Sequence, residues 1–139
     1  MLKIAICDDD IQIAGQMEMM IQNIAKRNYI DTDIEVFWNG ESLADTVASG
    51  DGFDIIFLDI EMYKEDGISA AKRIRIYDKN VLIIYVTSHE NHMKESFTVR
   101  PFRFMVKPVN ENQMEECFKA AYKDICNEDF YFRFSYQRI

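Results

Sequence analysis

The sequence predicts an α/β domain built on a doubly wound, five-stranded parallel sheet with helices on both faces. Several short apolar runs are bounded by polar residues, which is typical of strands that are buried on both faces. These runs alternate with segments whose apolar residues recur every three or four positions, the spacing of an amphipathic helix. Alternation with short connections implies right-handed crossovers and a parallel sheet. The 139 residues are enough for one such domain.

The expected strands cover residues 2–7, 33–37, 53–58, 81–86 and 102–106. The expected helices begin near residue 10, at about 39, at Gly67, at His89 and at Asn110. Asp9 or Asp10 can cap the first helix and Asn39 the second. Asn110 can cap the last helix, with Gln113 as its capping-box partner three residues later.

Composition excludes several classes of protein. A net charge of −8 argues against nucleic-acid binding by this piece alone, because phosphate contacts need clustered Lys and Arg. Three cysteines form neither a disulfide framework nor a metal-binding spacing, which fits a reducing cytoplasm. No apolar stretch approaches the roughly 18 residues of a membrane span, and no signal peptide precedes the first strand. We therefore expect a cytoplasmic protein without membrane contact.

Polar side chains follow the ends of four expected strands. Asp8 and Asp9 follow the first, Asp59 the third, Thr87 the fourth and Lys107 the fifth. Parallel strands end at the same edge of the sheet, and ligands bind in the crevice outside that edge. These side chains are therefore expected to meet in one cleft.

That combination of groups suits phosphoryl chemistry on Asp59. Three carboxylates at close range repel one another, and a hard divalent cation with oxygen ligands, most simply Mg²⁺, relieves the repulsion. A hydroxyl and a fixed ammonium complete a site for a phosphoryl group, whose transfer needs an in-line nucleophile and charge neutralisation. Asp59 is the candidate nucleophile.

With these residues in place, the chain resembles the receiver domain of a two-component response regulator over residues 1–126. The resemblance rests on Asp8-Asp9, Asp59, Thr87 and Lys107-Pro108, in this order and at successive strand ends. Five short segments further resemble receivers that are joined to LytTR-type DNA-binding domains: ICDDD, FLDIEM, DGI, VTSHE and FRFMVKP. The fold implied has flavodoxin-like strand order 2-1-3-4-5.

The resemblance implies a role for each site residue. Asp59 would be the phosphoacceptor, taking its group from a phosphohistidine of a sensor histidine kinase. Asp8, Asp9, Asp59 and the backbone carbonyl of Glu61 would hold Mg²⁺. Thr87 would hydrogen-bond the phosphoryl group and Lys107 would pair with it. The Lys107–Pro108 peptide is typically cis in this family. The protein would be a signalling phosphoacceptor, limited to self-catalysed phosphotransfer and autodephosphorylation, and not an enzyme in the ordinary sense.

The resemblance also implies a switch. Phe104 matches the family's aromatic switch position, which responds together with the Thr87 hydroxyl. The change would reshape the face of the fourth helix, fifth strand and fifth helix, where many receivers form homodimers. Two departures stand out: Tyr63 replaces the usual proline four residues after the phosphoacceptor, and Glu61 adds a carboxylate beside the site.

The tail has a different pattern. In residues 127–139, Phe130, Phe132, Phe134 and Tyr136 alternate with more polar positions at a period of two, which predicts a strand. We interpret it as a linker and the start of a truncated LytTR-like domain, through which alone the protein would contact DNA. An extra edge strand of the first domain is the alternative.

Other functions share part of the pattern. An aspartyl-phosphate hydrolase of the haloacid dehalogenase type also combines Asp, Thr and Lys, but needs a second Asp where this chain has Glu61. A flavodoxin-like FMN carrier needs a hydroxyl- and Gly-rich loop where three Asp stand at 8–10. A pseudo-receiver, used only as a binding module, is a third possibility. It is disfavoured because every expected site residue is present in this chain.

Overall fold

The computed structural model describes residues 1–62, 65–88 and 99–137. The predicted sheet is confirmed. Five parallel strands lie in the order β2-β1-β3-β6-β7, which in chain order is 2-1-3-4-5. Their bounds are β1 Leu2–Cys7, β2 Thr32–Phe37, β3 Ile55–Leu58, β6 Leu82–Thr87 and β7 Arg103–Val106.

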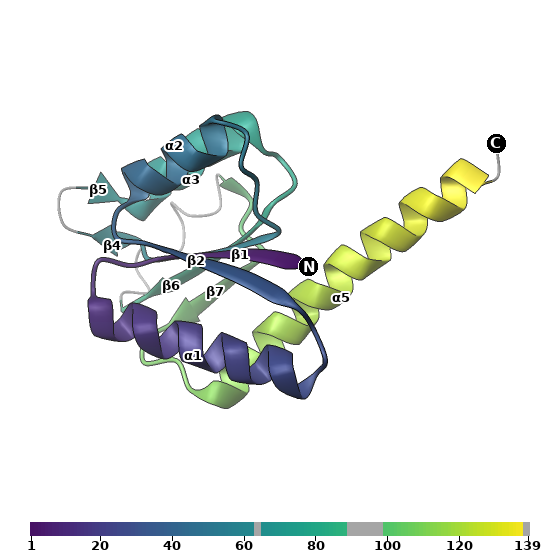
Figure 1. Ribbon diagram of the computed structural model, residues 1–139. Coiled ribbons are helices and arrows are strands. Elements are labelled where there is room, and N and C mark those ends of the chain that lie inside the picture. The colour runs from purple at the N-terminus through teal and green to yellow at the C-terminus, as the bar shows by residue number, and fades with distance from the viewer. Residues whose placement is uncertain (63–64, 89–98, 138–139) are drawn as a thin grey trace.

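Helices cover both faces of the sheet (Figure 1). Helices α1 (Ile11–Arg27) and α5 (Glu111–Gln137) lie on one face, and α2 (Gly40–Ala48) and α3 (Gly67–Tyr77) lie on the other. Each face has its own apolar core, because successive strand residues point to opposite sides. Ile6 and Phe57 pack toward α1 and α5, whereas Cys7 and Leu58 pack toward α2 and α3.

The predicted caps explain where the helices start. Of the two candidates for α1, Asp10 is the cap, because its carboxylate accepts from the backbone N–H groups of Gln12 and Ile13. Asn39 caps α2 through Ser42 N. At the start of α5, Gln113 N donates to Asn110 Oδ1 and Asn110 N donates to Gln113 Oε1, the reciprocal pair of a capping box.

Two features depart from the sequence prediction. The segment after Asp59 forms a short antiparallel hairpin, β4 (Glu61–Met62) with β5 (Glu65–Asp66), where only turn residues were expected. The predicted strand in the tail is wrong, because residues 127–137 continue α5 as a helix. Extending a helix that is already formed adds one hydrogen bond per residue, whereas a lone strand has no partner for its backbone groups.

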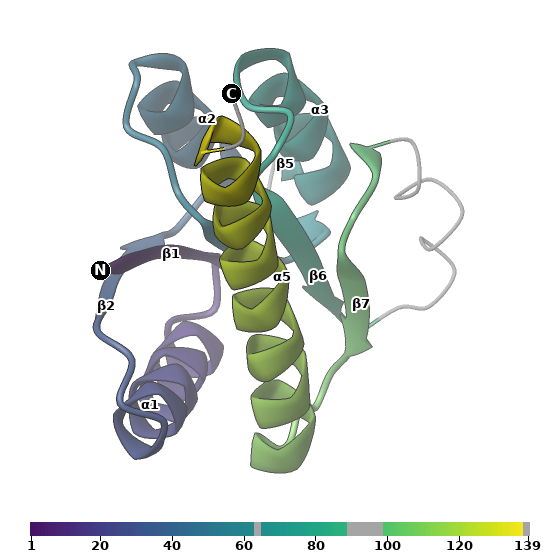
Figure 2. The same cartoon turned by 90° about the vertical axis from the view of Figure 1, so that its right-hand side faces the viewer.

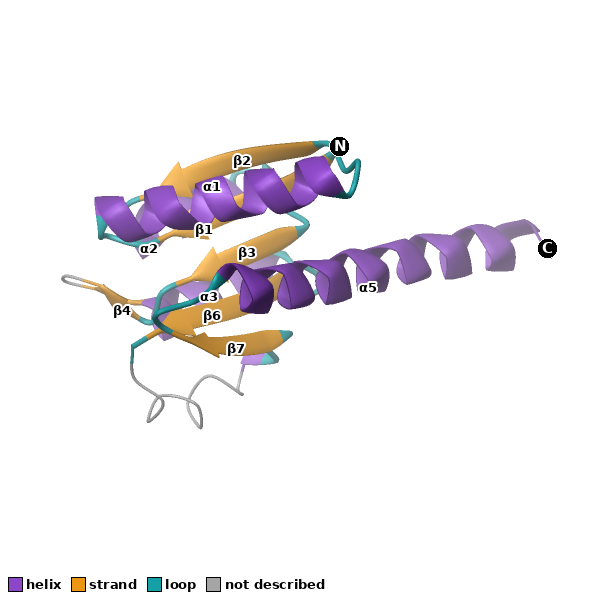
Figure 3. Cartoon of the chain, turned by 90° about the horizontal axis from the view of Figure 1, so that it is seen from below, coloured by secondary structure: helices purple, strands orange, loops and turns teal. Residues whose placement is uncertain are grey.

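Helix α5 projects well past the sheet on the side where its strands begin (Figure 3). No described helix is long and apolar enough to cross a bilayer. The predicted fourth helix at 89–97 and the Tyr63 position lie outside the described residues. The assignment of 127–139 to a second domain stays a prediction.

Candidate functional site

The predicted site residues meet at the carboxyl end of the sheet. Asp8 directly follows β1, Asp59 follows β3, Thr87 ends β6 and Lys107 follows β7. Asp8, Asp59 and Thr87 are almost completely buried, with exposed fractions of 1%, 5% and 0%. Buried carboxylates are costly without partners, so this end of the sheet must supply them.

Lys107 is that partner. Its Nζ lies 2.7 Å from Asp8 Oδ2 and 3.2 Å from Asp59 Oδ2, so one ammonium bridges two carboxylates that are 51 positions apart in the chain. The Lys107–Pro108 peptide that follows β7 is cis, as the family resemblance implied. The geometric prediction that the acids and the amine share one mouth is therefore confirmed.

Asp9 joins this group from the surface. One carboxylate oxygen each from Asp8, Asp9 and Asp59 lies within 4.8 Å of the others, and the Asp9 side chain is exposed. Three carboxylates against one ammonium leave negative charge in excess. Oxygen donors at this spacing are the ligands that a hard divalent cation prefers, so the residues fit the predicted metal.

Burial controls the ionisation of the central groups. Desolvation raises the pKa of Asp59 to about 6, helped by the negative charge of Asp8 and opposed by Lys107. Desolvation alone would lower the pKa of Lys107, but hydrogen bonds and charges from Asp8 and Asp59 more than offset it, and the pKa is raised. Lys107 is therefore a permanent cation, while Asp59 is ionised at neutral pH at some cost to the fold.

Backbone contacts hold the carboxylates in place. Asp59 Oδ1 accepts from Glu61 N at 3.1 Å, and Asp8 Oδ1 accepts from Asp10 N at 2.9 Å. Gly67 packs against the backbone of Asp59 so closely that a Cβ there would lie 2.0 Å from the Asp59 carbonyl oxygen. Only glycine fits at that position, so the start of α3 is part of the site.

The two predicted switch residues lie on neighbouring strands. Thr87 O accepts from Lys107 N, which ties the end of β6 to the end of β7. Phe104 is half-buried on β7, and its ring centroid lies 6.2 Å from that of Tyr85 on β6. Tyr85 and Thr87 alternate onto the same face of β6. The Tyr85–Phe104 ring pair therefore lies two residues before the Thr87 hydroxyl along β6, on the same face of the sheet.

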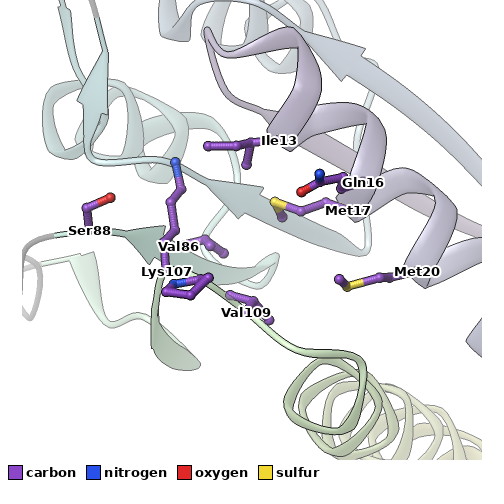
Figure 4. Close-up of a pocket in the computed structure, with 9 residues that line it drawn as sticks. Ile13, Gln16, Met17, Met20, Val86, Ser88, Lys107 and Val109 are labelled. Atoms are coloured by element: carbon purple, nitrogen blue, oxygen red, sulfur yellow. The ribbon is translucent and has the colours of Figure 1, made fainter.

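Sequence reasoning missed two neighbours of the site. The Cys7 thiol donates to Met62 Sδ at 3.7 Å, which joins β1 to the hairpin that follows Asp59. An apolar cleft of about 300 Å³ lies between α1 and the segment after β7, with Lys107 in its lining (Figure 4). Met17, Met20 and Val109 give it its apolar character. Neither was visible in the sequence, because each needs contacts between residues far apart in the chain.

Comparison with known proteins agrees with this site. Residues 4–119 match the response regulator receiver domain family. The sensory transduction protein LytR of Staphylococcus haemolyticus is 23% identical over 92% of this chain and 48% of its own length. The sensory transduction protein LytT of Bacillus subtilis is 25% identical over 88% of this chain and 49% of its own length. The chain thus spans about half the length of these curated relatives.

Solved structures agree on the fold. A CheY-like response regulator receiver domain protein from Methanospirillum hungatei has a TM-score of 0.81 at 17% identity, covering 92% of this chain and 98% of its own. A two-component response regulator from Clostridium difficile has a TM-score of 0.77 at 21% identity, covering 90% and 98%. The family match spans most of the chain, and the acids and lysine lie where the resemblance implied. The chain therefore belongs to the response regulator receiver domain family.

Proposed function

We propose that Asp59 accepts a phosphoryl group from the phosphohistidine of a sensor histidine kinase. The observation that carries this proposal is the Lys107 ammonium held between Asp8 and Asp59. An Asp59 oxygen would attack phosphorus in line, the P–N bond to histidine would break, and the freed imidazole nitrogen would take a proton. Lys107 would then pair with the new phosphoryl oxygens, and Thr87 would donate a hydrogen bond to them.

Mg²⁺ would be held by Asp8, Asp9, Asp59 and the backbone carbonyl of Glu61. Such an ion neutralises charge on the transferring phosphoryl oxygens. The chain's own contribution is to fix Asp59 through Glu61 N and Lys107 Nζ, so that its carboxylate does not need to reorient.

The apolar cleft beside Lys107 would receive the kinase domain that carries the phosphohistidine. A donor that reaches Asp59 must lie over the mouth of the site, and Lys107 belongs to both the mouth and the cleft. We expect Met20→Glu, inside the cleft, to slow transfer from a kinase while leaving labelling by acetyl phosphate unchanged. Met19→Glu, on the exposed side of the same helix, is the matched control. Equal effects of the two variants would contradict this docking site.

Phosphorylation would change the conformation of the face that the predicted fourth helix shares with β7 and α5. Phe104 is half-buried beside Tyr85, so a change in its rotamer would alter how much of the ring is exposed on this face. The output would be a LytTR-type DNA-binding domain that the chain does not include, consistent with relatives that are about twice as long. Homodimerisation through this face is part of the proposal, and the cytoplasm is the compartment that such a kinase partner implies.

The acceptor is tested by intact mass after incubation with acetyl phosphate and Mg²⁺. Wild type should gain the mass of one phosphoryl group, and Asp59→Asn should gain none. EDTA should prevent the reaction in wild type. An undiminished adduct on Asp59→Asn would reject Asp59 as the acceptor, and so would the absence of any adduct on wild type.

The switch is tested separately by aromatic NMR of Phe104. Identical spectra of the Phe104 ring with and without beryllofluoride would reject its role as a switch.

A further inference from the structure

A second charged pocket lies at the opposite end of the sheet, where β6 and β7 begin. This amino-end pocket has a volume of about 320 Å³, at the small end of the range for ligand sites. Its cationic side chains are Arg75 from α3, Lys79 from the following turn, and Arg100 from the turn before β7; its apolar part is Leu82, Pro101 and Phe102. Positive charge here contrasts with the net charge of −8 for the whole chain.

The cations of this pocket have no ion-pair partner within the described ranges. Elsewhere Arg27 pairs with Glu111 and Glu115, Arg73 with Asp45, and Lys107 with Asp8 and Asp59. No described side chain in the lining of the pocket carries a carboxylate. The nearby Asp78 forms no ion pair with these cations: its Oδ1 accepts from the backbone N–H groups of Asn80 and Val81. Its charge acts on Arg75 only at longer range, where it partly offsets the lowering of the pKa of that guanidinium by burial.

Arg75 is preorganised. Its half-buried guanidinium donates to the carbonyl oxygens of Val99, Val81, Asp78 and Arg100 at 2.7, 2.7, 3.4 and 3.2 Å. A guanidinium has five N–H donors, so one Nη2–H has no acceptor in the part of the chain that is described. Desolvation lowers the pKa of Arg75, and the positive charge of Arg100 lowers it further. The pocket thus holds a fixed cation that repels its neighbour.

Arg100 is held in an unusual backbone conformation. Its φ of 56° is in the left-handed region, which a bulky side chain rarely adopts, and Pro101 follows it. Its carbonyl oxygen accepts from Arg75 Nη2, so the turn keeps both guanidinium-bearing residues at one opening. Fixed positive charge beside an apolar and aromatic wall suits a ligand with an anionic head and a flat apolar body.

We propose that the amino-end pocket binds a small phosphorylated ligand of the mononucleotide class. The phosphoryl group would take the open Nη2–H of Arg75 and pair with Lys79 and Arg100. The base would lie against Phe102 and Pro101. The pocket is at the far end of the sheet from Asp59, so this site is separate from the phosphoacceptor and does not depend on its function.

The test is a ¹H–¹⁵N NMR titration of the full chain without Mg²⁺, at constant ionic strength, with adenosine monophosphate, inorganic phosphate and adenosine. Saturable shifts should centre on the amides of Val81, Leu82 and Phe102. Adenosine monophosphate should bind about tenfold more tightly than phosphate, because its base adds contacts with Phe102 and Pro101. Adenosine should not bind detectably, because it lacks the anionic group that the three cationic side chains would hold. Equal affinity for phosphate and adenosine monophosphate would overturn the proposal, as would shifts spread over the whole surface.

Charge-reversal variants complete the test. Lys79→Glu and Arg100→Glu, both at exposed positions, should each weaken binding of adenosine monophosphate at least about tenfold. Lys72→Glu, an exposed α3 residue outside the pocket, changes the net charge equally and should alter affinity less than about twofold. Equal weakening by Lys72→Glu would reduce the effect to overall charge and overturn the proposal. Labelling of Asp59 by acetyl phosphate should be unchanged in all three variants.

Discussion

The two ends of the sheet treat charge in opposite ways. At the carboxyl end, buried Asp8 and Asp59 share the half-buried ammonium of Lys107, the partner of both carboxylates. At the amino end, a half-buried guanidinium is held by backbone carbonyl oxygens and meets no described carboxylate (Figure 2 shows β7 starting beside α3 at this end). Removing the cation should therefore destabilise the fold strongly at the first end and mildly at the second, because only the loss of Lys107 leaves buried carboxylates unpaired.

Lys107→Met should have the largest effect. It leaves two buried carboxylates without their cation, and breaking such a pair costs about 3–5 kcal/mol of unfolding free energy. Urea denaturation at pH 8 in EDTA measures it. Much of the loss should return at pH 5, where the raised pKa of Asp59 lets that carboxylate take up a proton. A loss that is small and independent of pH would contradict the coupling of these three residues.

Asp59→Asn should stabilise the protein in EDTA at neutral pH. The folded pKa of Asp59, about 6, lies above its ordinary value of 3.8, so the folded state binds the proton more tightly. Wild-type stability therefore falls as pH rises from about 4 to 6, by at most about 3 kcal/mol at 1.36 kcal/mol per pKa unit. Asn escapes this loss, so the difference between variant and wild type should grow over that window and then level off. A constant difference would show that burial of the charge is not costly.

Arg75→Met should cost less than Lys107→Met, about 1–2 kcal/mol. It removes hydrogen bonds to four carbonyl groups, two of them on the buried residues Val81 and Val99, but it leaves no buried ion unpaired. Thermal denaturation of the two variants under identical conditions compares the two ends directly. A greater loss for Arg75→Met would reverse the ranking of the two ends.

Tyr29→Gly should have the smallest effect, a gain of about 0.5 kcal/mol. Tyr29 lies in the turn after α1, at the end of the sheet where the strands begin. Its φ of 57° is in the left-handed region, and the residue is 96% exposed, so packing contacts do not offset the backbone strain. Glycine relieves that strain but increases the entropy of the unfolded chain, so the gain is small. Urea denaturation should resolve the sign, and Tyr29→Ala, which keeps the strain, serves as the control.

Sequence patterns identified what depends on local chemistry. The strands and caps followed from apolar runs and from capping residues such as Asp10 and Asn110, because these act within a few positions. The strand order was implied by the family resemblance. The meeting of Asp8, Asp59 and Lys107 was also predictable, because parallel strands end on the same side. The contact of Arg75 with Val99 was not, because it depends on how distant segments approach each other. The β4–β5 hairpin was not either, because each of its strands has two residues, too few to show an alternating pattern. The prediction of a strand in residues 127–139 was wrong, because an alternation of period two is weak evidence for a strand when no neighbouring strand is available to pair with it.

The continuous course of α5 has a mechanical consequence. Its 27 residues form a rod about 40 Å long at 1.5 Å per residue, of which the first part packs on the sheet and α1. A rod anchored at its base acts as a lever: tilting the base by about 10° moves the far tip by roughly 7 Å at that length. A tilt of that size at the base would therefore reach anything attached beyond residue 137 as a displacement large enough to change which surfaces touch.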